Sequence, residues 1–317
     1  MTTYTTKQLK QFRNHEVKLG LKSFVYKNLH GKYQSPAGFY DWNKILLGYA
    51  PFSEPEYLDV IRKSPEHSEA PISVAVGAIA AASLDAPAVY ITRELTEALV
   101  RTDTTIEKSP ELVLPCFFVC LPKGSFYTDR GSAITSLLIY TAEAVKTVIP
   151  QSIDTDRKAS LMETVSSKKD NLYVTGVAED YEIFSSITGW TECSGHDVDN
   201  DATAVCTALE RIAKNVILIY NYQKNLITTH QPKAISKGFG ERNTCKTRSP
   251  LPVTLLGQDF LVRRSSAASQ DNAATVKNTK RPHWRKGHWH TTVCGAGRKE
   301  RRLKWFQPVY VNAGLDA

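Results

Sequence analysis

The sequence lacks long apolar runs and is poor in cysteine, and both shortages narrow the class of protein. It contains no run of the eighteen or so uncharged apolar residues that a membrane-spanning helix needs, and residues 1–10 are polar where a signal peptide would have an apolar core. The six cysteines are scattered without a Cys-x-x-Cys pair, which favours free thiols over a disulfide framework. These absences predict a cytoplasmic protein.

The usual catalytic motifs are missing as well. The sequence has no P-loop, no zinc-protease motif and no nucleophile elbow, and its Gly-x-Gly turns at 238–240 and 295–297 lack the third glycine of a dinucleotide-binding loop. The acidic run 196–201 begins like a calcium loop but has Ala202 and Ala208 where that loop needs glycine and a bidentate glutamate. We therefore predict no catalytic residue and no cofactor, and a function other than catalysis is favoured.

The apolar residues, 42% of the chain, follow both helical and strand periodicities, so the predicted fold class is α+β: a mixed α/β body with a C-terminal basic β-hairpin-like module. Thr92 has the character of a helix N-cap between a strand and a helix. Residues 134–149 fit a strand or a helix equally well. The predicted helices are 6–22, 71–84, 93–100 and 202–226, and the predicted strands are 88–91, 111–121, 125–129 and 171–177, with a hairpin joining 111–121 to 125–129.

Composition divides the chain into four expected regions. Residues 1–150 form an N-terminal α/β region, and residues 151–264 form a second α/β region that contains the long core helix 202–226. Residues 265–279 are small and polar with a single large apolar residue, Val276, and are expected to be a linker because they cannot offset their ordering entropy by burial. Residues 280–317 form a basic module rich in Trp and His.

The net charge of +8 comes from one segment. Residues 277–304 hold ten lysines and arginines against a single acid, Glu300, so the remainder of the chain is close to neutral. A local positive field of this kind usually serves an acidic partner such as nucleic acid.

In this segment cations alternate with flat rings. Lysine and arginine neutralise phosphates, while Trp and His offer faces on which unstacked bases can lie, so the mixture favours single-stranded or structured RNA. Two strands joined by residues 295–299 are expected to form a twisted hairpin with cations at its tip. The predicted binding residues are Arg281, His283, Trp284, Arg285, Lys286, His288, Trp289, His290, Arg298, Arg301 and Trp305.

Two other interpretations of the same residues stay open. In the first, Trp289, Trp305, Phe306, Val309 and Val311 form only a small hairpin core, and the cations keep it soluble. In the second, the hairpin holds tetrahedral zinc, although the spacing matches no usual structural pattern and the cations would repel a dication. The zinc ligands would then be His283, His288, His290 and Cys294.

The C-terminal residues 280–312 also resemble a known family. Residues 280–290 (KRPHWRKGHWH), the turn at Gly295 and Gly297, and residues 305–312 (WFQPVYVN) resemble the C-terminal signature of the type V-A anti-CRISPR family, the second of that series, found in phages and mobile elements. Weaker similarity runs upstream through residues 89–99, 113–129 and 255–264.

The resemblance implies a mixed α/β protein that acts in a bacterial host cell without conventional catalysis. It implies suppression of a type V effector nuclease, by binding the nascent N-terminal peptide of that nuclease and causing loss of its mRNA. The partners expected for this chain are therefore a nascent peptide of a defence effector and RNA or a ribosome–nascent-chain complex, with no membrane. A metal-dependent nuclease and a nucleic-acid-binding regulator of a mobile element remain the alternatives, and the sequence leaves the oligomeric state open.

Overall fold

The computed structural model describes residues 6–54, 70–106, 110, 113–146, 172–190, 201–231, 251–265 and 282–311. Its centre is a seven-stranded mixed sheet in the order β6-β5-β4-β3-β1-β8-β7. Strand β1 pairs in parallel with both β3 and β8, and the remaining neighbours are antiparallel. The strands are β1 (Ala88–Ile91), β3 (Cys116–Cys120), β4 (Ile134–Thr141), β5 (Leu172–Ala178), β6 (Ile183–Thr188), β7 (Ile227–His230) and β8 (Val253–Leu256).

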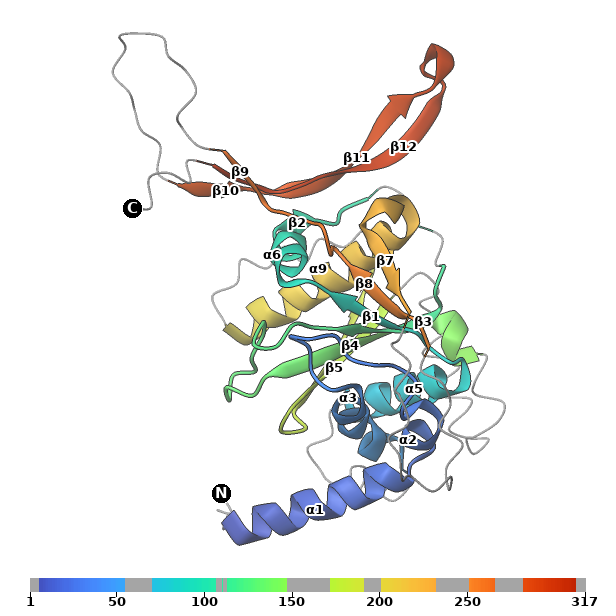
Figure 1. Cartoon of the computed structure of the whole chain (residues 1–317), viewed down its shortest axis with the longest axis vertical. Coiled ribbons are helices and arrows are strands. Elements are labelled where there is room, and N and C mark those ends of the chain that lie inside the picture. Colours follow the sequence, from blue (N-terminus) through green and yellow to red (C-terminus); the bar gives the residue numbers. More distant parts are fainter. Residues whose placement is uncertain are drawn as a thin grey trace, which may run out of the picture.

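Helices from the N-terminal part of the chain cover one face of this sheet (Figure 1). Helix α5 is rich in alanine, which lets its backbone approach the strands closely: a Cβ added at Gly77 would meet the ring of Tyr140 at 2.5 Å. Asp41 caps α3 by accepting hydrogen bonds from two backbone amides of the first turn. The helices are α1 (Thr6–Lys22), α2 (Phe24–Leu29), α3 (Trp42–Tyr49), η1 (Ala50–Ser53) and α5 (Ala70–Ser83).

The opposite face carries α6 (Arg93–Val100) and the 22-residue helix α9 (Asp201–Tyr222), which is followed by the short turn η2 (Lys224–Leu226). Successive side chains of a strand point to opposite faces of the sheet, so each strand contributes to both cores. In β1, Tyr90 packs into the core under α5, whereas Val89 and Ile91 pack under α6 and α9. Because helices cover both faces, the strands β1, β3, β4 and β5 are buried at every position.

The structure confirms the predicted fold class and most of the predicted elements. The helices expected at 6–22, 71–84, 93–100 and 202–226 are present within two residues, except that the last ends at Tyr222. Thr92 caps α6, because its hydroxyl accepts a hydrogen bond from the amide of Leu95. The ambiguous segment begins as β4 and turns helical at residues 142–146.

The hairpin predicted between residues 111–121 and 125–129 is wrong. Strand β3 instead pairs with β4, and residues 125–129 lie in the connection, where a bridge between Tyr127 and Ala133 and backbone hydrogen bonds to Ser132 and Ile134 hold them. The reason is burial: β4 is apolar enough to lie in the middle of the sheet, whereas Tyr127 is exposed.

One sheet takes strands from both sides of residue 150, since β1, β3 and β4 precede it and β5 to β8 follow it. The linker expected at 265–279 lies outside the described residues except for Ser265, which ends strand β9 (Arg263–Ser265). Within the described residues, none of the helices is both long and apolar enough to span a membrane.

Candidate nucleic-acid interface

The basic module forms a long two-stranded ribbon, and residues 283–311 are called the C-terminal ribbon below. One side consists of β10 (His283–Arg285) and β11 (Gly287–Cys294), and the other of β12 (Glu300–Phe306) and β13 (Val309–Val311). The register is continuous, because Arg285 pairs with Val309 and His288 pairs with Phe306 without a slip. The predicted hairpin is thereby confirmed, and its second strand is interrupted only next to Pro308, which has no amide hydrogen for the ladder.

Two short strands of the body extend the ribbon at different points. Strand β2 (Thr102–Asp103) follows α6 and pairs in parallel with the start of β11, and β9 pairs in parallel with β13. In Figure 1 the ribbon crosses the body next to β2 and α6, on the side away from α1, and its β11–β12 end projects beyond the body.

A buried polar contact holds β11 on the body. The indole Nε1 of Trp289 donates to Oδ1 of Asn215 at 2.7 Å, and Nδ2 of Asn215 donates to the carbonyl oxygens of Leu99 at 3.1 Å and Thr102 at 3.4 Å. Asn215 is fully buried on α9. Its amide therefore ties the ribbon, α6 and β2 together, with both of its ends hydrogen-bonded.

The neighbouring strand is anchored by Trp305, which lies directly across the ladder from Trp289. Its Nε1 donates to the hydroxyl of Thr102 at 3.2 Å, and its ring stacks on Phe260 with centroids 5.6 Å apart. Gly287 allows this close approach, because an added Cβ would lie 2.7 Å from both Thr102 Oγ1 and Pro308 Cδ. Both tryptophans are only 6% exposed and belong to the core under α9.

The projecting end of the ribbon carries its charge. The turn β11–β12 needs left-handed backbone at three residues, Gly295, Gly297 and Arg298, with φ values of 81°, 69° and 54°. The acid of this end, Glu300, accepts a hydrogen bond from Arg302 at 2.7 Å. The exposed cations of this end are Arg298, Lys299, Arg301, Arg302 and Lys304.

The ribbon face opposite the two buried tryptophans presents rings to solvent. His288 and Phe306 are cross-strand partners whose rings stack at 5.1 Å with an interplanar angle of 7°. His290 lies edge-on to the same Phe306 ring, and the Lys304 ammonium lies 6.0 Å from its centroid. Phe306 is 40% exposed, so an aromatic face flanked by a cation remains accessible.

Asp103 is an acid beside this face, in register with His288 across β2 and β11. Burial alone raises the pKa of Asp103, but hydrogen bonds from the amide and hydroxyl of Thr105 and the charge of Arg211 outweigh burial, so the pKa is lowered overall. The carboxylate is therefore ionised at neutral pH and limits the positive field on that side.

The structure brings together all but one of the predicted binding residues. Arg281 lies outside the described residues, and Trp289 and Trp305 face the body. The two tryptophans are buried, as the open hairpin-core interpretation expected, but they belong to the core of the body and not to a separate hairpin core, and Phe306 is exposed. The predicted residues with exposed side chains are His283, Arg285, Lys286, His288, His290, Arg298 and Arg301, and Trp284 is half-buried.

Around Trp284 sequence reasoning missed three contributors, because they come from other parts of the chain or lie across the ladder. The guanidinium of Arg101, at the end of α6, lies 4.4 Å from the centroid of the Trp284 ring. Tyr310 lies opposite Trp284 on the partner strand, with its ring 5.1 Å from that of Trp284, and Arg264 on β9 is in register with Tyr310. Only Tyr310 carried a signal, through strand alternation.

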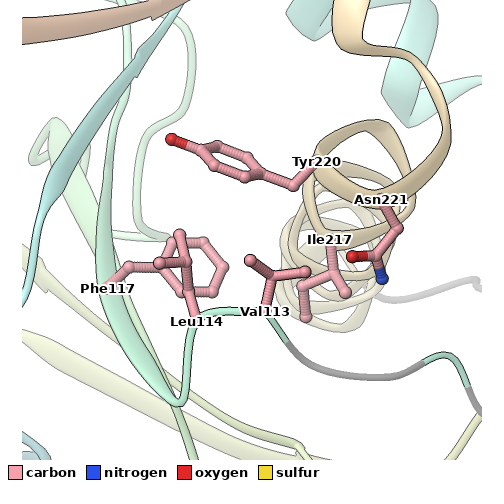
Figure 2. Close-up of a pocket in the computed structure, with 6 residues that line it drawn as sticks. All are labelled: Val113, Leu114, Phe117, Ile217, Tyr220 and Asn221. Carbon is pink, nitrogen blue, oxygen red and sulfur yellow. The ribbon is translucent and has the colours of Figure 1, made fainter.

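Other candidate sites among the described residues offer less chemistry. A pocket between β3 and α9 is lined by Val113, Leu114, Phe117, Ile217, Tyr220 and Asn221, and so by no acid, base or thiol (Figure 2). Cys116 and Cys120 are fully buried, and burial raises the pKa of both thiols, which makes them core residues.

The structure also bears on the zinc alternative. His283, His288, His290 and Cys294 all lie in the described part of the chain, and no three His, Cys, Asp or Glu side chains there are grouped closely enough to hold a metal ion. The last three are spaced along a single extended strand, β11, which separates their donor atoms.

The fold and the site together define a class: a mixed α/β protein whose body presents a docked, basic β-ribbon. The model of the anti-CRISPR type V subtype A2 (AcrVA2-like) family matches residues 79–313, and the chain belongs to that family. This match confirms the resemblance seen in the tail and assigns the chain to suppression of a host defence system. Searches of the curated proteins and of the solved structures found no match.

Proposed function

We propose that this protein suppresses production of a host defence effector on behalf of a phage or mobile element, and that its C-terminal ribbon binds RNA of the translating complex while the body recognises the nascent peptide. The observation that carries the RNA part is the projecting ribbon end, where five exposed cations stand against one acid that is itself paired with Arg302. Membership of the anti-CRISPR family supports a target within a defence system.

The geometry suits a phosphate backbone for an electrostatic reason. The cations lie on a narrow projection that water surrounds, so a polyanion can approach from either ribbon face without displacing the body (Figure 1). Each phosphate neutralised releases condensed counterions, and the resulting affinity falls with salt. If about six cations meet phosphates, the RNA affinity drops on the order of a thousandfold between about 50 and 200 mM salt.

A filter-binding titration across salt concentrations tests the RNA part. Replacing Arg298, Lys299, Arg301 and Lys304 together with glutamine should reduce the slope of log affinity against log salt by about 3, because single strands lose about 0.7 per phosphate contact. The matched control replaces four exposed lysines on the far side of the body, Lys18, Lys22, Lys27 and Lys44, and should leave the slope unchanged. A flat salt response of the wild-type chain would refute RNA binding by the ribbon.

A second experiment tests whether the protein recognises the mRNA or the nascent peptide of a target gene. The full chain is co-expressed with a type V effector, and effector protein and mRNA are both measured. Synonymous recoding of the first codons changes the RNA but keeps the peptide, so suppression should persist. A compensated frameshift over the same codons keeps nearly the same RNA but changes the peptide, so suppression should be lost; suppression that survives it would refute peptide recognition.

A further inference from the structure

The continuous register of the ribbon sorts its side chains into two faces over its whole length. Residues with odd numbers on both strands share the face of Trp289 and Trp305, whose side chains dock on the body, and residues with even numbers share the opposite, outer face. Away from these two tryptophans the odd-numbered face is also exposed, as at His283, Arg285 and Arg301. The outer face therefore includes Trp284 and Tyr310 at one end and His288 and Phe306 further along. Both are cross-strand ring pairs.

The two ring pairs have the same centroid distance and a regular position on the ribbon. Within each pair the ring centroids are 5.1 Å apart, and the pairs are separated by four residues along each strand, which at about 3.3 Å per residue is roughly 13 Å. None of these four side chains belongs to the two hydrophobic cores. The rings thus form two platforms on one face of the ribbon, and the body core accounts for neither.

Cations flank each platform. Thr102 pairs with Gly287 and points inward to Trp305, so the preceding residue, Arg101, belongs to the outer face. The guanidinium of Arg101 lies over the ring of Trp284. Arg264 is exposed beside Tyr310 on β9. At the second platform Lys304 lies over Phe306. The carboxylates on this face are Asp103, beside His288, and Glu300, which is paired with Arg302.

We propose that the outer face of the ribbon is a track for single-stranded RNA, in which unpaired bases stack at the Trp284–Tyr310 and His288–Phe306 platforms while phosphates lie along the flanking cations. This inference rests on the proposed RNA-binding function and narrows it to one substrate class. Exposed aromatic rings discriminate single-stranded RNA from a duplex. An unstacked base offers its flat face to a ring, whereas a duplex buries the faces of its bases and presents its phosphates.

The test uses the full chain and labelled RNA in a fluorescence anisotropy assay. The probes are an unstructured 12-nucleotide RNA and a duplex of the same length, at one fixed salt concentration, and their length lies within the range of single-strand sites of about 4–16 nucleotides. The ring variant replaces Trp284, Tyr310 and Phe306 with leucine, which keeps apolar volume and removes the aromatic faces. The control replaces the exposed Phe24 and Tyr127 of the body with leucine.

The ring variant should bind the single strand at least tenfold more weakly, since each stacked base contributes a factor of roughly 5 to 150. Its duplex affinity and its salt slope should stay those of the wild type, and the control should match the wild type with both probes. Equal losses on the two probes, or no loss on the single strand, would overturn the track. In either case RNA binding that still depends on the tip cations leaves the proposed function standing, whereas a wild-type chain that binds neither probe refutes both.

Intrinsic fluorescence supplies a second readout that reports on Trp284 directly, and circular dichroism of the same variant checks that it is folded. Trp284 is half-buried on the outer face, whereas Trp289 and Trp305 are buried. In the wild type the single-stranded probe should quench tryptophan emission by stacking, and Trp284→Leu alone should abolish most of that quenching. Quenching that survives in Trp284→Leu would contradict the platform.

Discussion

The two faces of the C-terminal ribbon use the same kinds of residue for opposite purposes. On the inner face Trp289 and Trp305 are buried, and both indole N–H groups donate to buried oxygens of the body. On the outer face the rings of His288 and Phe306 stack on each other and stay in contact with solvent. The difference teaches that a ring-rich basic segment can be anchor and interface at once, divided by strand parity.

If the inner face is the anchor, Trp305→Ala should show the largest effect on stability. The substitution removes a buried indole and its stacking on Phe260, so we expect the free energy of unfolding to fall by about 3–5 kcal/mol. The measurement is chemical denaturation followed by circular dichroism. Phe306→Ala, one position along the same strand but 40% exposed, should cost about 1 kcal/mol or less, and similar losses in both variants would abolish the distinction.

The polar part of the anchor is tested by Asn215→Leu. This change leaves the buried Trp289 N–H without its acceptor, and an unsatisfied buried group costs about 1–3 kcal/mol. Adding Trp289→Phe removes the stranded N–H, so the double variant should be less destabilised than the sum of the single changes. Strict additivity in this double-mutant cycle would show that the two side chains are not coupled.

Substitutions at two glycines test how closely the inner face of the ribbon approaches the body. Gly287→Ala would place a Cβ within 2.7 Å of Thr102 Oγ1 and 2.9 Å of the Pro308 nitrogen, so we expect a loss of about 1–3 kcal/mol by overcrowding. The comparison variant is Gly297→Ala at the tip, where the added Cβ meets only Lys299, at 3.7 Å and beyond. There the positive φ of 69° should cost about 1 kcal/mol. A larger loss at Gly297, measured by denaturation, would contradict tight docking.

Much of the fold could be predicted, because local patterns decide it. Thr92 before an amphipathic stretch, the alanine-rich α5 and the apolar period of α9 each identify their element without help from the rest of the chain. The pairing of β3 with β4 could not be predicted from the sequence, because strand partners depend on which segment is buried. Residues 125–129 are closer in sequence to β3 but are less apolar than residues 134–141, which take that place.

The candidate site was predicted only in part, for a related reason. Alternation puts Trp305 and Phe306 on opposite faces, and this can be read from the sequence, but nothing in the tail tells which face the body covers. That is decided by Asn215 and Thr102, more than seventy residues away along the chain. Arg101 is likewise brought to the interface by the pairing of β2 with β11.

The smallest effects on stability belong to the charged tip, where they separate stability from binding. Glu300 and Arg302 form an exposed pair, so Glu300→Gln and Arg302→Gln should each change the free energy of unfolding by about 0.5 kcal/mol or less. Their effects on RNA affinity at low salt should have opposite signs, because the first removes the acid of the tip and the second removes a cation. Glu300→Gln should tighten binding several-fold and Arg302→Gln should weaken it, as measured by anisotropy with the 12-nucleotide probe. Weakening by both would mean that the ion pair itself shapes the tip, and that the positive field alone does not govern RNA binding.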